Sequence, residues 1–370
     1  MNIKKIAILS VIIMVVALTV LSGCTPVAAP PTTAAAATTA AAAAETTAAA
    51  AAAETTAAAK KDVTIGFSSA GRFSLALIAG EVYLRTFAEE KGWIFITAIA
   101  ENDAAKQAQD IEDLLARNVD LMEIMAVDSK AIISSIQSVH AAGLKAVGYM
   151  RPQDPNGADK YDGFAGQDTV AQAYDGAIEL SKLMDKDGVK PADVKALHIV
   201  GDPKDENALK RKEGFEKAAK ELGWTIVAEV TCDGWNLDKA LTGATNALEA
   251  DKGINVVLLA SDYLWPGVKT ALQNQGMLKK AGEKGHVYVA SQDVFPIAVD
   301  DIKAGYIDTS TVLDMGGMAK IATDMAEQLL NGKVFDDTTT PKQFNWMAAP
   351  VVTLANIDKT PNLWGVQFHP

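Results

Sequence analysis

From residue 62 onward, the sequence predicts an α/β fold with two doubly wound, parallel-sheet lobes. Short, β-branched apolar runs alternate with amphipathic stretches of helical spacing, which is typical of βαβ units. The alternation contains two successive runs of four or more predicted strands, more than one sheet of this size usually holds. Two lobes are therefore expected.

The first lobe is predicted from short strands separated by helices, and the third helix is followed by Gly143, a residue favoured just after a helix C-terminus. In chain order the elements are strand 63–67, helix 75–91, strand 93–99, helix 104–117, strand 121–127, helix 130–142 and strand 145–149.

The same alternation of strands and helices predicts the second lobe and a final helix. In chain order these elements are helix 169–184, strand 195–200, helix 208–222, strand 225–230, helix 237–249, strand 255–259, helix 266–275, strand 286–290 and helix 316–330.

The N-terminus predicts export and lipidation. Lys4 and Lys5 precede the apolar run 6–21, which is shorter than the roughly 20 residues that span a membrane. The run ends in Leu-Ser-Gly-Cys24, which resembles the bacterial lipobox, so residues 1–23 are expected to be a lipoprotein signal peptide and Cys24 the acylated residue. A plain N-terminal membrane anchor is the alternative.

Residues 25–59 are nearly all Ala and Thr and cannot form a core, so the segment 24–61 is expected to be a tether. The protein is thus expected in the cell envelope, exported and anchored to the lipid bilayer through Cys24.

Composition excludes several classes of protein. The formal net charge of −12 argues against a nucleic-acid partner, because phosphate binding needs a basic face. Two cysteines cannot build a disulfide framework or a zinc finger. Neither a metal nor a cofactor is expected, and Cys232 is expected to be a small buried apolar residue.

Polar and aromatic side chains gather where predicted strands end, and in doubly wound sheets ligands bind outside the carboxyl ends of the strands. Carboxylates, amides and arginine hold hydroxyl groups, while flat rings cover the apolar face of a sugar. Each polar residue alone could instead be a helix cap or a turn former. The five segments are 68–73, 149–151, 201–207, 261–265 and 291–295.

Three of the stretches carry a resemblance: Asp205-Glu-Asn-Ala208 followed by Arg211, Asp233-Gly-Trp235, and Ser291-Gln-Asp293. With them, the chain from about Asp62 resembles the type I periplasmic binding proteins, in the xylose- and ribose-binding branch of sugar-transport receptors.

The resemblance implies that residues of both lobes bind the sugar. Trp265, which follows a strand end, is predicted to stack on the sugar. The alternative is that Trp265 packs in the core or on the surface of a lobe. The predicted ligand-binding residues are Arg72, Phe73, Arg151, Asp205, Asn207, Trp265, Asp293 and Asp314. Met150, Ser261 and Asp314 depart from the family's pattern, so the identity of the sugar is left open.

The resemblance also implies a mechanism, in which two lobes joined by three hinge crossings close on a monosaccharide and dock on an ABC permease in the cytoplasmic membrane. The expected lobes are 62–167 plus 314–334 and 168–313 plus 335–370. The expected crossings lie near 167–168, 311–314 and 335–340.

Two other functions stay open. The chain could be a sensor or receptor for another small polar molecule, such as an inositol, a nucleoside or a furanosyl autoinducer. A secreted carbohydrate-active enzyme is more remote, because the four histidines show no ligand spacing and no Gly-x-Ser-x-Gly motif follows a strand. We therefore expect a binding protein and not an enzyme.

Overall fold

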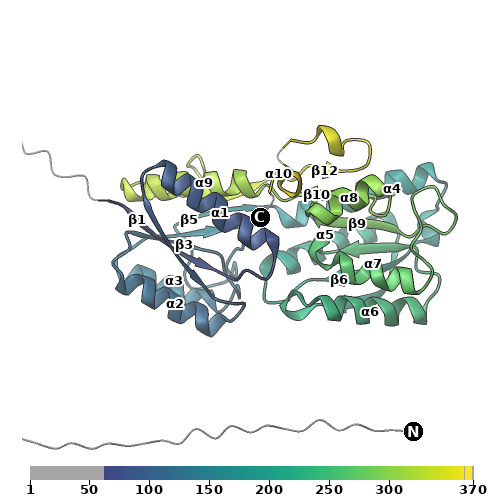
Figure 1. Cartoon of the computed structure of the whole chain (residues 1–370), viewed down its shortest axis with the longest axis horizontal. Helices are drawn as coiled ribbons and strands as arrows, with labels where there is room; N and C mark the ends of the chain where they lie inside the picture. The colour runs from purple at the N-terminus through teal and green to yellow at the C-terminus, as the bar shows by residue number, and fades with distance from the viewer. Residues whose placement is uncertain (1–61, 362, 369–370) are drawn as a thin grey trace, which may run out of the picture. The chain divides into compact units, whose positions relative to one another are not determined.

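The computed structural model of the chain describes residues 62–361 and 363–368, which form two α/β lobes, each built on a six-stranded sheet (Figure 1). The predicted signal peptide, Cys24 and the predicted tether lie outside these residues. Within the described part, no helix is both long enough and apolar enough to cross a membrane.

The sheet of the first lobe has the order β11-β5-β4-β3-β1-β2, and all its strands are parallel. Its strands are β1 (Thr64–Ser69), β2 (Ile94–Ile99), β3 (Leu121–Ile124), β4 (Ala146–Tyr149), β5 (Gly163–Gln167) and β11 (Phe344–Met347).

The sheet of the second lobe has the order β12-β10-β9-β8-β6-β7, and only its edge strand β12 is antiparallel. Its strands are β6 (Lys195–Val200), β7 (Thr225–Thr231), β8 (Val256–Leu259), β9 (Tyr288–Asp293), β10 (Thr309–Val312) and β12 (Val351–Val352).

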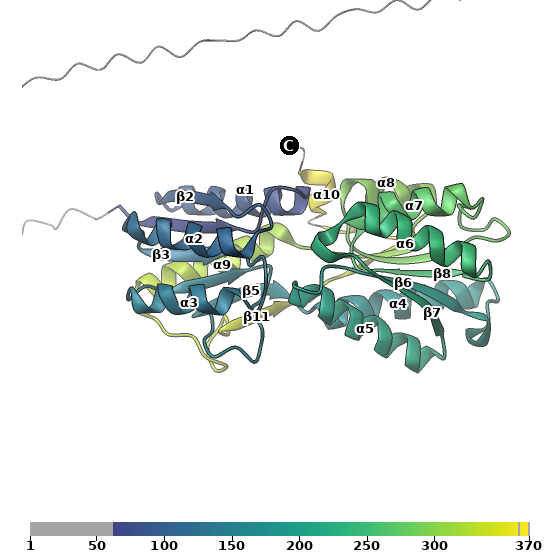
Figure 2. The ribbon, with the colours of Figure 1, turned by 90° about the horizontal axis from the view of Figure 1, so that it is seen from below.

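Helices cover both faces of each sheet. In the first lobe, α1 (Leu75–Glu90) and α9 (Met315–Leu330) pack on one face, while α2 (Ala104–Ala116) and α3 (Ile132–Ala141) pack on the other (Figure 1). In the second lobe, one face carries α4 and α5 and the other carries α6, α7 and α8 (Figure 2). These helices are α4 (Thr169–Lys186), α5 (Glu206–Leu222), α6 (Leu237–Ala250), α7 (Trp265–Asn274) and α8 (Pro296–Ala304). The short C-terminal helix α10 (Trp364–Gln367) packs against α8.

This double coverage explains the continuous apolar strands. Along β8, Val256 and Leu258 face the core beneath α4 and α5, whereas Val257 and Leu259 face the core beneath α6 and α7. Because successive side chains point to opposite faces, a strand that is covered on both sides must be apolar throughout.

The chain crosses between the lobes from β5 to α4, from β10 to α9 and from β11 to β12. The first two crossings lie where the sequence predicts them. The third lies at residues 348–350 and not near 335–340, because β11 pairs with β5 in the first sheet. The expected assignment of all of 335–370 to the second lobe is therefore corrected: β11 belongs to the first lobe, and β12 to the second.

Candidate functional site

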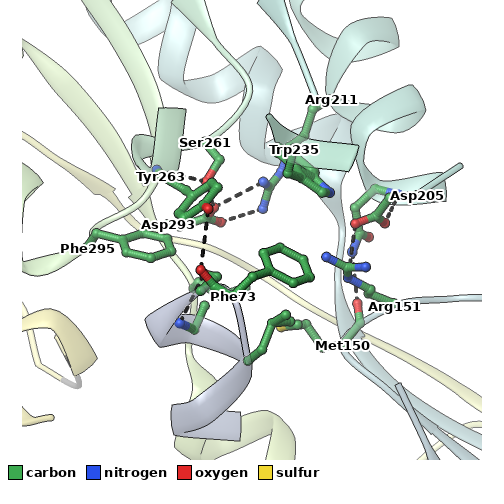
Figure 3. A pocket seen from close by; sticks show the side chains of 15 residues that line it. Phe73, Met150, Arg151, Asp205, Arg211, Trp235, Ser261, Tyr263, Asp293 and Phe295 are labelled. Atoms are coloured by element: carbon green, nitrogen blue, oxygen red, sulfur yellow. Dashed lines mark hydrogen bonds and ion pairs between the residues drawn. The ribbon is translucent and has the colours of Figure 1, made fainter. Parts of the chain in front are cut away.

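A pocket lies between the lobes at the carboxyl ends of β1, β4, β6, β8 and β9 (Figure 3). The pocket contains about 460 Å³ of empty space, part of which is open to solvent. Its lining residues are Phe73, Ser74, Ala76, Leu77, Met150, Arg151, Asp205, Asn207, Arg211, Trp235, Ser261, Tyr263, Asp293, Phe295 and Leu313.

The centre of the second-lobe wall is a buried ion pair between Arg211, on α5, and Asp293, at the end of β9 (Figure 3). Arg211 donates from Nη2 to Oδ1 of Asp293 at 2.5 Å and from Nη1 to Oδ2 at 3.2 Å. Ser261 Oγ also donates to Asp293 Oδ2, at 2.5 Å. The carboxylate is thus fixed by three donors, while the buried Nε of Arg211 has no protein acceptor.

A second ion pair joins the lobes. Arg151 follows β4 in the first lobe, and its Nε lies 3.1 Å from Oδ2 of Asp205 in the second. Asp205 also caps α5 by accepting from the backbone N–H of Asn207 at 3.0 Å, and Asn207 Nδ2 donates to the carbonyl of Met150 at 3.0 Å. Two arginines and two aspartates therefore balance, which makes the pocket suited to an uncharged ligand.

A further carboxyl group, Asp262, lies beside this network. It accepts from the backbone N–H of Phe295 at 3.2 Å and from Ser310 Oγ at 3.2 Å. Burial, with a further contribution from the charge of Asp293, raises the pKa of Asp262 to about 7. At neutral pH, Asp262 is therefore only partly ionised.

Aromatic rings from both lobes complete the pocket. The hydroxyl of Tyr263 donates to the backbone carbonyl of Phe73 at 3.3 Å, which links the second lobe to the first. The ring of Tyr263 lies 6.2 Å from that of Phe73 and 6.1 Å from that of Phe295, centroid to centroid. Trp235 has a buried Nε1 that no protein acceptor reaches, so both it and Arg211 offer an unused donor beside the pocket.

Strained backbone concentrates at the pocket. Met150 (φ 61°), Trp235 (φ 56°) and Asp293 (φ 93°) all adopt positive φ values, which residues other than glycine rarely adopt. Such conformations persist where the surrounding structure imposes them, and they cluster at ligand sites.

The structure brings five of the predicted site residues into this pocket: Phe73, Arg151, Asp205, Asn207 and Asp293. It places three elsewhere. Arg72 pairs with Glu81 at 2.8 Å on a half-exposed surface, and Asp314 caps α9 through Gly317. Trp265 is fully buried in the second lobe, where its Nε1 donates to Asp301 at 2.6 Å, so its ring does not reach the pocket.

The predicted set omitted most of the second-lobe wall. Ser261, Tyr263 and Phe295 lie in the polar segments at strand ends, and Arg211 and Trp235 belong to the stretches that carry the family resemblance, so these were the available signals. What the sequence does not show is which side chain of each segment turns into the pocket.

Cys232 is buried in the apolar core of the second lobe, as predicted, and burial raises the pKa of its thiol to about 12.

A metal site was not expected from the sequence. Across residues 62–361 and 363–368, no group of three or more His, Cys, Asp or Glu side chains is placed to hold a metal ion.

Comparisons with known proteins agree with this geometry. The family described as periplasmic binding protein domain matches residues 77–334. The ribose import binding protein RbsB of Bacillus subtilis (strain 168) is 25% identical over 279 residues, which cover 75% of this chain and 85% of that protein. The D-xylose-binding periplasmic protein of Escherichia coli (strain K12) is 24% identical over 245 residues, which cover 65% of this chain and 69% of that protein.

Among solved structures, an ABC transporter solute-binding protein from Mycobacterium smegmatis with bound glycerol superposes with a TM-score of 0.68 and 25% sequence identity. The match covers 80% of this chain and 96% of that chain.

Proposed function

Because this chain belongs to the periplasmic binding protein domain family, we propose that it is the substrate-binding lipoprotein of an ABC importer and captures a monosaccharide between its lobes. The observation that carries this proposal is the charge-balanced pocket with unused buried donors at Trp235 Nε1 and Arg211 Nε. A sugar hydroxyl is neutral and can both accept and donate, so it fits donors of this kind beside carboxylates. Relatives named for ribose import and D-xylose binding support the same substrate class.

Capture involves closure of the lobes about the crossings. Contacts between the lobes surround the pocket: Arg151 with Asp205, Asn207 with the carbonyl of Met150, and Tyr263 with the carbonyl of Phe73. Each contact has one partner in each lobe, so each forms only when the lobes approach. A ligand that touches both walls therefore favours the closed state over the open state, as in hinge-bending proteins.

The closed form delivers its sugar to a permease in the cytoplasmic membrane and releases it chemically unchanged. Acylated Cys24 and the tether of residues 24–61 hold the lobes at the extracytoplasmic surface of a membrane. A lipid anchor with a tether of this length keeps the binding protein near its permease and leaves the lobes free to close.

The binding proposal is tested on the whole chain, purified in detergent, by isothermal titration calorimetry and thermal unfolding with pentoses, hexoses, inositols and nucleosides. A ligand that binds only the folded state raises the unfolding midpoint. We expect a monosaccharide to raise the midpoint, and Arg151→Ala to abolish the rise, whereas Asp358→Asn, which alters an exposed ion pair with Lys303, leaves it unchanged. A response to inositols or nucleosides but to no sugar would overturn the substrate class.

Recovery of the bound sugar tests whether the chain transforms it. We expect mass spectrometry of the released ligand, after prolonged incubation, to return the starting sugar alone. A new product that depends on Asp205 or Asp293 would instead indicate an enzyme.

The anchor has its own test, because the chain has only two cysteines, Cys24 and Cys232. Labelling of producing cells with radioactive palmitate is expected to mark the wild type and Cys232→Ala but not Cys24→Ala. Label that persists in Cys24→Ala would contradict the lipoprotein proposal.

A further inference from the structure

A second pocket is lined by residues of both lobes and shares no lining residue with the first. On the first-lobe side, Pro152 and Gln153 follow Arg151 directly and line this second pocket. On the second-lobe side, Glu206 follows Asp205 and lines it as well. The two pockets therefore lie next to each other, beside the Arg151–Asp205 ion pair. The second contains about 890 Å³ of empty space, part of which is open to solvent, against about 460 Å³ in the first.

An exposed indole forms one wall of the second pocket. Trp346 lies on β11, the edge strand of the first sheet (Figure 2), and is 48% exposed. Its ring packs on that of the buried Phe164, with 5.0 Å between the centroids, and is inclined by only 23° to that of Phe344. The indole is thus held in place while part of its surface stays open. A fixed, flat and partly exposed ring is suited to stacking on the apolar face of a sugar ring.

Two polar groups of the second pocket lack a hydrogen-bond donor. Gln153 is only 2% exposed, and its Oε1 has no hydrogen-bond partner among the described residues. Glu206 is half-buried, and burial raises the pKa of its carboxyl group without a hydrogen bond to offset the effect. A buried acceptor without a partner is costly, and a hydroxyl group of a ligand would supply the missing donor.

The charges along the second pocket favour a neutral ligand. Lys160 and Lys210 line it together with Asp168 and Glu206, so cations and carboxylates are equal in number. Lys210 is also held by Glu213, with 2.9 Å between Nζ and Oε2. Asp168 caps α4 and Glu206 lies in the first turn of α5, where the helix dipole stabilises a carboxylate. Neither an anion nor an organic cation therefore finds an excess of countercharge.

We propose that the second pocket binds a neutral oligosaccharide, with one sugar ring stacked on Trp346 and its hydroxyl groups donating to Gln153 and Glu206. Trp346 belongs to the first lobe and Glu206 to the second, so a ligand that contacts both favours the closed state. Binding in the two pockets is then coupled, and each ligand raises the affinity for the other by the same factor. This coupling rests on the proposed capture of a monosaccharide by lobe closure, whereas the oligosaccharide site itself does not.

Fluorine NMR of the whole chain in detergent, with 5-fluorotryptophan in place of its six tryptophans, resolves the two pockets. Trp235 reports on the first pocket and Trp346 on the second, and each signal is assigned by its loss in the corresponding Phe variant. The probes are maltotriose, cellotriose, xylotriose and chitotriose. We expect at least one probe to shift the Trp346 signal, and to shift it more than that of Trp235. A Trp346 signal that no probe shifts, or probes that shift only Trp235, would overturn the second site.

Calorimetry with the best probe tests the assigned contacts. Trp346→Ala removes the stacking surface and should weaken binding about tenfold or more. Gln153→Met keeps the length of the side chain without its acceptor, so it should weaken binding about tenfold without lowering the unfolding midpoint, because Oε1 has no partner to lose. The control Val334→Ala alters an apolar side chain that is 71% exposed outside the pocket, and should bind as the wild type does. Wild-type affinity in either pocket variant would overturn the contact assigned to that residue.

The coupling is measured by repeating the titration with the first pocket saturated by the monosaccharide that binds it. We expect the affinity for the oligosaccharide to rise about fivefold or more. Equal affinities with and without the monosaccharide would overturn the coupling and leave the second site intact. If no monosaccharide binds, the proposed function fails, while the Trp346 signal still reports on the second pocket. The two failures are therefore distinguishable.

Discussion

Arg151 and Asp205 form a buried ion pair that joins the two lobes beside the pocket, with Nε and Oδ2 3.1 Å apart. Both side chains are more than nine-tenths buried. Asp205 also caps α5, so a single carboxylate fixes the start of a helix in one lobe and contacts the other lobe. In the proposed mechanism, this pair couples ligand binding to lobe closure.

Asp205→Asn separates these two roles, because asparagine is as good an N-cap as aspartate but carries no charge. We expect sugar affinity to fall at least tenfold, since Arg151 loses its counter-charge in the closed state. Thermal stability without ligand should change little, because this ion pair forms only when the lobes approach. Asp103→Asn is the matched control, because Asp103 caps α2 on the surface. Equal affinities for the wild type and Asp205→Asn would show that the ion pair contributes nothing to closure.

Asp293→Asn removes the charge that balances Arg211. A buried ion pair that loses one partner costs about 3–5 kcal/mol, so the free energy of unfolding in urea should fall by that order and sugar binding should be lost. The comparison is Asp358→Asn, whose side chain is 78% exposed in its pair with Lys303 and whose loss should cost about 1 kcal/mol or less. Similar losses for both variants would contradict the structural role of the Arg211–Asp293 pair.

Trp235→Phe and Trp265→Phe each remove an indole N–H but are expected to act differently. Trp235 lines the pocket with an unused Nε1 donor, so its variant should bind sugar about tenfold or more weakly. Trp265 donates to Asp301 inside the second lobe, so its variant should lose stability and keep the wild-type affinity. The opposite result in calorimetry would place the functional tryptophan at Trp265.

Glu123, on β3, should make the stability of the protein depend on pH. Its carboxyl oxygens are buried without a hydrogen-bond partner, and burial raises its pKa from 4.5 to about 8. Between these values the unfolded chain has released this proton while the folded chain keeps it. Stability should therefore fall as pH rises from about 4.5 to about 8, by roughly 1.4 kcal/mol for each pH unit.

Urea unfolding of wild type and Glu123→Gln across this range isolates the contribution of Glu123, because the other titrating groups are common to both proteins. We expect the stability of the variant relative to wild type to rise steadily with pH up to about 8 and then to level off. A difference that does not change with pH would mean that Glu123 titrates normally in the folded state.

The family, the α/β class and most element boundaries could be predicted from the sequence, because local patterns carry them. The apolar run of β8 and the caps at Asp103 and Asp205 are examples. The edge strand β11 and the helix α8 were not predicted. β5 was missed as well, since glycines at 163 and 166 weaken its strand pattern, although its pairing with β4 and β11 stabilises it.

The positions of polar segments at strand ends were likewise determined by the sequence, because parallel strands bring their carboxyl ends to one edge. Which side chain turns into the pocket was decided only by tertiary packing. Trp235 and Trp265 both follow strand ends, yet Trp265 is held in the core by Asp301, while the indole of Trp235 packs against Gly201, where a Cβ would come within 2.2 Å of the ring. These contacts join residues far apart in the chain, so no local pattern could have distinguished the two tryptophans.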